Sequence, residues 1–145
     1  MSVTREQVMT ALLGLISTSA EYKLVSRRNR APETITPALS PALFLLEDAE
    51  SYVRRSPSLP PIRTLTAKAV IYNNVGPNPN LIPTTVVNQA LDALDALFVR
   101  DNASNGFCTL GGLVYSATIE GEIVKAPGDQ TGVALAIVPI KLQLP

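Results

Sequence analysis

The chain of 145 residues contains no histidine and only one cysteine, Cys108. Histidine is the usual general base, the usual activator of a nucleophile and the commonest metal ligand, so its absence removes three kinds of active site together. One cysteine excludes a disulfide within the chain and any site built from several thiolates. Because Phe107 and Leu110 lie close to Cys108 in the sequence, we expect a buried structural thiol. The composition argues against an enzyme.

Long apolar runs are also missing. No run approaches the roughly 20 residues that a membrane-spanning helix needs, so we expect no membrane partner. Residues 9–20 could imitate a signal peptide, but Arg5 and Glu6 precede them and favour a capped amphipathic helix, which predicts a cytoplasmic origin. Hydrophobic residues make up 46% of the chain. That fraction is typical of a folded protein, and the length predicts a single domain over residues 1–145.

Formal charge is balanced overall but unevenly placed. Residues 1–72 hold nine Lys/Arg and six Asp/Glu, whereas residues 73–145 hold three and six. One interpretation is two solvated faces that differ in charge. The other is a molecule with complementary sides, suited to head-to-tail contact between identical copies. Neither favours nucleic-acid binding as the main role, which needs a net basic surface.

Local patterns predict the elements. Thr4 and Gln7 fit a capping box at the start of a helix that runs to about Ser19. A second helix is predicted from Thr84 or Thr85 to about Phe98, with apolar residues at helical spacing. Strands are predicted over residues 22–27, 42–46 and 64–72, and irregular structure over residues 32–41, 51–61 and 73–80.

The last third of the chain predicts two long strands, Leu113–Ile123 and Val133–Leu142, joined by a turn over residues 125–132. The second strand is apolar on both faces, and Pro139 favours placing it at a sheet edge or a bulge, where a missing donor costs little. The element order predicts an α+β fold: a mainly antiparallel sheet with two helices packed on one face and a long C-terminal β-hairpin.

Few residues suggest chemistry. Glu120 and Glu122 fall on one face of the predicted strand, roughly 7 Å apart, which suits either a two-carboxylate hydrolase or a solvated strand face. Gly111 and Gly112 lack the spacing of a nucleotide-binding loop and predict a turn or bulge instead. No catalytic, metal-binding or cofactor-binding residue is assigned.

Two groups of arginines lie beside proline-rich segments: Arg27, Arg28 and Arg30, then Arg54 and Arg55. Such groups are often simply solvated. Arginine also suits protein interfaces, because its planar guanidinium pairs with carboxylates and its stem tolerates burial. DNA contact has little support, since no aromatic residues interleave with these arginines.

Taken together, the segments resemble the tail terminator family of long-tailed bacteriophages. The resemblance follows one order along almost the whole chain and rests on the ensemble. The segments that carry it are Ala11–Leu15, Ser26–Arg28, Pro41–Leu45, Val70–Tyr72, Val87–Leu94, Leu110–Gly112, Ile119–Gly121 and Val138–Ile140.

The resemblance implies a structural virion protein that assembles as a hexameric ring on the head-proximal end of the tail tube. Such rings stop tube polymerisation and present the surface on which the head–neck complex docks, without cofactor or reaction. The implied partners are further copies of the chain, the tube protein and a neck connector protein, with DNA only as cargo passing through the lumen.

The chemistry of the chain nominates candidate residues for a subunit or tube interface. They are Arg27, Arg28, Arg30, Arg54, Arg55, Glu120, Glu122, Val133, Leu135 and Ile137. Two other functions stay open: another connector or stopper protein of the neck, and a small hydrolase that uses Glu120 and Glu122.

Overall fold

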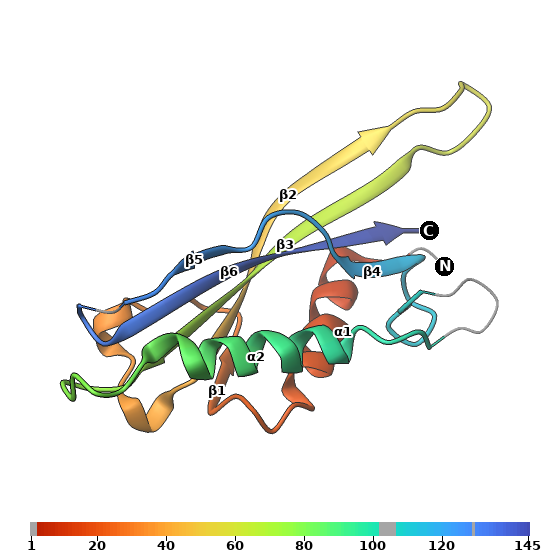
Figure 1. The fold of residues 1–145 in the computed structure, drawn as a ribbon. Helices are drawn as coiled ribbons and strands as arrows, with labels where there is room; N and C mark the ends of the chain where they lie inside the picture. Colours follow the sequence, from red (N-terminus) through yellow and green to blue (C-terminus); the bar gives the residue numbers. More distant parts are fainter. Residues whose placement is uncertain (1–2, 102–106, 129) are drawn as a thin grey trace.

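The computed structural model describes residues 3–101, 107–128 and 130–145. Within them the chain forms two α-helices, two short 3-10 helices and six strands (Figure 1). The elements are α1 (Arg5–Ser17), β1 (Leu24–Ser26), η1 (Pro32–Thr34), η2 (Pro37–Leu39), β2 (Ala42–Val53), β3 (Ile62–Asn74), α2 (Pro83–Leu97), β4 (Ser116–Ile119), β5 (Val124–Ala126) and β6 (Val133–Leu144).

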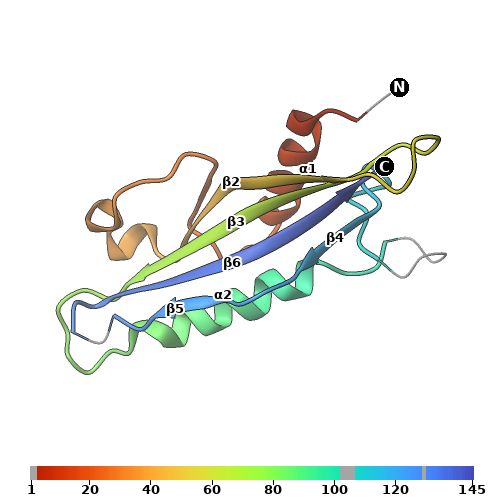
Figure 2. The same cartoon turned by 90° about the horizontal axis from the view of Figure 1, so that it is seen from above.

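All six strands belong to one twisted sheet. Its order is β1-β2-β3-β6-β4, and β5 pairs with β6 on the same side as β4. Only β1 and β2 run parallel. Viewed from above, β2 and α1 lie toward one margin, whereas β4, β5 and α2 lie toward the other (Figure 2). The predicted α+β class and mainly antiparallel sheet are confirmed.

Both helices begin close to their predicted positions, for different reasons. The Gln7 N–H donates to the Thr4 hydroxyl at 3.1 Å, and the Thr4 N–H donates to the Gln7 side chain at 2.8 Å, so the predicted capping box is present. The second helix begins at Pro83 instead of at a threonine cap, and Ile82 at its N-cap makes no side-chain bond. Proline suits the first helical position because the missing N–H has no intrahelical partner there.

One face of the sheet packs against both helices, as predicted. From α1 this core takes Val8, Met9, Leu12 and Ile16, and from α2 it takes Val87, Ala90 and Leu94. The strands contribute alternate residues, since neighbouring side chains on a strand point to opposite faces. Those of β3 are Leu65, Ala67, Ala69 and Ile71, which is the predicted set.

The other face carries a smaller core beneath the chain between β1 and β2. Parallel strands need a crossover, and residues 27–41 provide it. Ile35 from this crossover is fully buried against Phe44 and Tyr72, whose rings lie edge to face at 5.8 Å between centroids. The predicted irregular crossing segment is confirmed, with Pro32 and Pro37 at the starts of η1 and η2.

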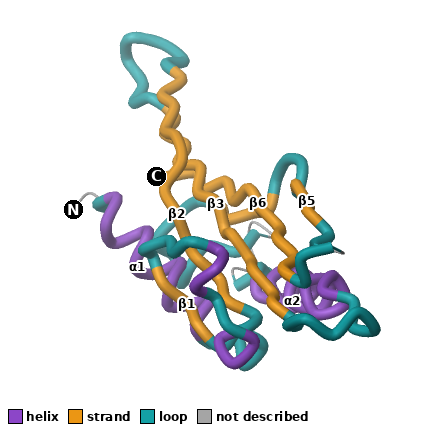
Figure 3. The backbone as a smooth tube through the Cα atoms, turned by 90° about the vertical axis from the view of Figure 1, so that its left-hand side faces the viewer, coloured by secondary structure: helices purple, strands orange, loops and turns teal. Residues whose placement is uncertain are grey.

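The strands β2 and β3 are longer than the sequence predicts. Residues 51–53, expected in a loop, continue β2, and residues 73–74, expected in a turn, end β3. The pairing from Ala42↔Tyr72 to Val53↔Ile62 is interrupted between Glu47 and Ala49 by a β-bulge. The distal part of this pair projects well beyond the rest of the sheet (Figure 3). We call residues 47–64 the hairpin arm.

The C-terminal hairpin is present, but its first strand differs from the prediction. The predicted strand Leu113–Ile123 is replaced by two short strands, β4 and β5, because the chain turns at Gly121, where φ is +117°. The second strand, β6, is not at a sheet edge, since β3 pairs with one side of it along its whole length and β4 and β5 pair with the other side. Pro139 instead faces the interval between β4 and β5, where its carbonyl accepts the Glu120 N–H at 3.3 Å. The backbone N–H that Pro139 lacks would therefore lie where neither β4 nor β5 pairs with β6.

Candidate assembly surface

The hairpin arm exposes apolar side chains on β2 and in the loop that follows it. Leu45 is the last fully buried residue of β2, and every residue from Glu47 to Val53 is exposed. Tyr52 and Val53 are each 55% exposed, and Leu59 in the connecting loop is 46% exposed. Large apolar groups held away from the body in this way are typical of surfaces that meet another protein.

Ion pairs hold the root of the arm against α1 and across the bulge. The Arg5 guanidinium contacts the Glu50 carboxylate and donates to the Tyr52 hydroxyl at 2.8 Å. The hydrogen bond and negative charge of Glu50 raise the pKa of Arg5. Across the bulge, Lys68 lies 3.5 Å from the Asp48 carboxylate. The Arg5 contacts link the arm to the first turn of α1, and the Lys68 contact links the bulge to β3.

An open cavity of about 500 Å³ lies between these groups, next to the bulge. Its lining residues are Arg5, Met9, Glu47, Asp48, Ala49, Glu50, Leu65 and Thr66. Three of them are acidic, and the outer edge of β2 beyond Phe44 has no partner strand among the described residues. Charges and a bulge at such an edge are the usual protection against unwanted strand pairing.

The tip of the arm is basic and internally bonded. Arg54 and Arg55 are exposed, and the Arg55 guanidinium donates across the loop to the Pro60 carbonyl at 3.4 Å. The Leu59 N–H donates to the Ser56 carbonyl at 3.3 Å, which closes a turn. Within the described residues, no carboxylate pairs with either arginine. The two nominated arginines are thus presented on a formed loop.

The first arginine group has a different environment. Arg27 contacts the Glu6 carboxylate and lies 3.8 Å from that of Glu47, so it joins α1 to the root of the arm. Glu6 raises the pKa of Arg27, and the hydrogen bond from Arg27 lowers that of Glu6. Arg28 and Arg30 are exposed at the start of the crossover. The sequence grouped all three, but the structure gives Arg27 partners within its own chain.

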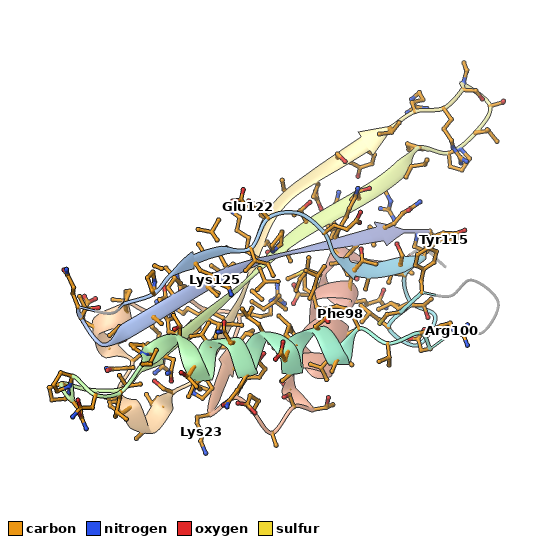
Figure 4. The ribbon with its side chains drawn as sticks, viewed as in Figure 1. Lys23, Phe98, Arg100, Tyr115, Glu122 and Lys125 are labelled. Atoms are coloured by element: carbon orange, nitrogen blue, oxygen red, sulfur yellow. The ribbon has the colours of Figure 1, made fainter. Side chains whose placement is uncertain are left out.

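Glu120 and Glu122 lie in the connection between β4 and β5, on either side of Gly121. The prediction that they share one face of a continuous strand is wrong, because the strand ends at Ile119. Both side chains are exposed, and Glu120 accepts from the Thr118 hydroxyl at 2.9 Å. Figure 4 shows Glu122 at the margin of the sheet, on the side away from α2. The pair is presented at a sheet margin.

The three nominated residues of β6 point away from the helices. Val133, Leu135 and Ile137 are half-buried, and they alternate with the fully buried residues of the helix-side core. Leu135 and Ile137 pack against the smaller core, whereas Val124, opposite Ile137 on β5, is 53% exposed. This apolar surface is therefore partly covered by the chain itself, and its open part lies at β5.

Residues 109–111, which precede β4, are held by the carboxylate of Asp101. Asp101 accepts from the Thr109 N–H at 2.8 Å, from its hydroxyl at 2.6 Å and from the Gly111 N–H at 3.0 Å. Chiefly because of the Gly111 N–H and then the Thr109 hydroxyl, the pKa of Asp101 is lowered. The predicted turn at Gly111 and Gly112 is present, both with positive φ. Cys108 is buried, as predicted, and burial raises its pKa.

Sequence analysis missed the hairpin arm and its acidic root. Residues 47–53 have no apolar alternation, so the pattern of β2 stops at Leu46. One signal was available in the lengths of the predicted strands. The alternating run over residues 64–72, which forms part of β3, is longer than the apolar run over residues 42–46, so an antiparallel partner of matching length must extend past Leu46. Among the described residues no cluster of three or more potential metal ligands occurs, and none of their helices is long and apolar enough to cross a membrane.

Comparison with known proteins gives weak structural likeness. No protein-family model matches the chain, and no curated protein matches it by sequence. A solved structure described as "Virion of native gene transfer agent (GTA) particle" contains a chain that superposes with a TM-score of 0.47 and 7% identity. The match covers 91% of this chain and 82% of that one. A likeness at this level leaves the function to be argued from the residues.

Proposed function

We propose that the protein is a structural component of a phage-like virion, without enzymatic activity. In this proposal it forms a ring on the head-proximal end of a tail tube, stops polymerisation of the tube and provides the docking surface for the head–neck complex. The basis is the ordered resemblance of its segments to tail terminators. The observation that carries the proposal is the hairpin arm, which presents exposed apolar and basic side chains away from a folded body.

The shape and charges of the chain are suited to this role. A terminator must bind the end of a tube and also refuse the next tube subunit, so it needs different surfaces for its different neighbours. A ring needs a heterologous contact, in which one patch meets a different patch on the next copy. The chain offers a basic arm tip at one place and the acidic connection of Glu120 and Glu122 at the opposite margin of the sheet.

The direct test is electron microscopy of particles assembled without this protein. We expect over-long tails or tails that lack heads, because nothing stops the tube or receives the head. Tails of normal length joined to heads would contradict the proposal.

The second candidate is another neck protein, a connector or stopper, which would use the same kinds of surface on a different partner. Purified protein added separately to tail tubes and to filled heads distinguishes the two. Binding at the end of the tube supports the terminator, and binding only at the portal of filled heads supports the connector.

A further inference from the structure

The tip of the hairpin arm combines positive charge with exposed apolar surface. Residues 51–63 contain three arginines and no acidic residue. Val53 and Leu59 lie among them, 55% and 46% exposed. Three prolines and the turn closed by the Leu59 N–H limit the conformations of this loop. A preformed loop loses little conformational entropy on binding, which favours its use as a docking element.

The opposite margin of the same sheet combines negative charge with exposed apolar surface. Glu120 and Glu122 are exposed there, and Val124 follows them at 53% exposure. The nearby lysine, Lys125, donates to Asn88 of α2 at 3.1 Å and so leans toward the helix (Figure 4). The bond from Glu120 to the carbonyl of Pro139 ties the connection to β6, so this patch is also preformed.

We propose that the arm tip of one copy docks on the β4–β5 connection of a second copy. Arg54 and Arg55 then meet Glu120 and Glu122, while Val53 and Leu59 cover Val124. This inference rests on the ring proposed above and names the contact that joins its neighbours. The two patches lie on different parts of the chain, so the contact repeats head to tail and closes into a ring if the rotation between copies allows it.

The charges disfavour the other ways in which two copies could meet through these parts. If two copies met through their arm tips, the arginines of one copy would face those of the other. The open edge of β2 carries Glu47, Asp48 and Glu50, so placing it beside the β4–β5 margin opposes carboxylates with carboxylates. Tip against the open edge of β2 would also bring opposite charges together, but Glu47, Asp48 and Glu50 already pair with Arg27, Lys68 and Arg5 of the same chain. Within the described residues no basic side chain pairs with Glu120 or Glu122, so the connection offers the uncompensated carboxylates. Exposed ion pairs contribute little affinity but strongly bias which surfaces associate, and the apolar residues contribute most of the affinity.

A charge-exchange experiment tests the contact. One variant carries Arg54→Glu and Arg55→Glu, and another carries Glu120→Lys and Glu122→Lys. We expect each alone to weaken self-association about tenfold or more at low salt, measured by sedimentation velocity. An equimolar mixture of the two should regain association, because each reversed patch then meets a complementary one on the other variant.

The matched control is Arg28→Glu with Arg30→Glu, which makes the same charge change on exposed arginines of the crossover. Equal weakening by this control, or failure of the mixture to regain association, overturns the proposal. Absence of self-association in the natural chain at the highest soluble concentration also overturns it.

Disulfide trapping locates the contact independently. Copies with Arg54→Cys mixed with copies carrying Glu122→Cys should cross-link under mild oxidation. Copies with Arg30→Cys mixed with the same Glu122→Cys copies should not. Native Cys108 is 5% exposed and adds little background. Equal yields in the two mixtures overturn the proposal. If cross-linking fails but the chain still ends tail tubes at normal length, only this contact is lost. Cross-linking without any effect on tube length removes the terminator role instead.

Discussion

The strands β2 and β3 run through two environments, and the difference separates what folds the protein from what it offers to partners. Near the body, both faces of the pair are covered: Leu43 and Ile71 face the helices, while Phe44 and Tyr72 lie under the crossover. In the hairpin arm the same two strands continue with polar contacts at its root, and beyond them the side chains of β2 are exposed and those of β3 are half-buried. Burial of apolar area dominates stability, so we expect the body to carry the free energy of folding.

Strand pairing explains why the arm stays ordered without a core of its own. Its ladder to β3 continues to Val53↔Ile62, and β6 flanks β3 as far as Arg63↔Leu144. The pairing within the body therefore sets the register of the arm. A segment that is ordered by the body, and that contributes little to the stability of the body, is free to vary for binding.

The largest expected effect comes from the body. Phe44→Ala removes a fully buried ring that packs on Tyr72, and should lower the free energy of unfolding by about 3–5 kcal/mol. Urea denaturation measures the change. Val53→Ala, on the same strand but in the arm, is the control and should cost less than about 0.5 kcal/mol. Similar losses for both variants would mean that the arm is part of the folding core.

A smaller loss is expected where the end of β3 meets the start of α2. The Asn73 side chain is 3% exposed and donates to the Pro83 carbonyl at 3.0 Å. Asn73→Ala removes this buried hydrogen bond and the packing of the amide, and should cost about 1–3 kcal/mol, measured by thermal or urea unfolding. Asn80→Ala, at an exposed position, should be close to neutral. If Asn73→Ala leaves the stability unchanged, water replaces the hydrogen bond, and this junction does not belong to the buried body.

Arg5→Met should affect the arm more than the body. The ion pair with Glu50 is exposed, so the expected loss of global stability is small. Amide hydrogen exchange over residues 49–53 should nevertheless become faster, because Arg5 bonds both Glu50 and Tyr52 and so holds this part of the arm to α1. Exchange rates in the arm that match those of the natural chain would show that the ladder alone fixes it.

The smallest effect on stability is expected at Asp101, which lies outside both the body and the arm of the β2–β3 pair. Because the folded state lowers the pKa of this carboxyl, its contribution to stability is present above the unfolded pKa, about 3.9, and is lost as the pH falls through the lower folded value. Asp101→Asn should therefore be less stable than the natural chain at pH 6, with a difference that shrinks toward pH 3. Unfolding midpoints across this range measure it. A constant difference would contradict the assignment.

How far the sequence predicts the structure differs between the same two regions. The capping box at Thr4, the buried alternation of β3 and the apolar run at Ala42 each reflect local chemistry or burial by the body, and all three are confirmed. The arm leaves no such periodicity, since neither of its faces is fully buried. Its length follows from strand pairing, which connects residues far apart in the sequence.

The candidate site was partly predictable for a related reason. Arginines and glutamates could be nominated by their chemistry, and Arg54, Arg55, Glu120 and Glu122 do lie at exposed margins. Their neighbours could not be foreseen, because Arg27 finds carboxylates on α1 and β2, and the turn at Gly121 removes the continuous strand face. Such details depend on where a chain bends, and glycine permits a bend without requiring it.

The central claim is that the hairpin arm serves assembly and not folding. The most direct measurement is the length distribution of tails, by electron microscopy, in particles made with the Arg54→Glu, Arg55→Glu chain, after urea denaturation has shown that its stability is unchanged. The account predicts over-long or headless tails from a fully folded protein. Tails of normal length, with heads attached, would contradict it.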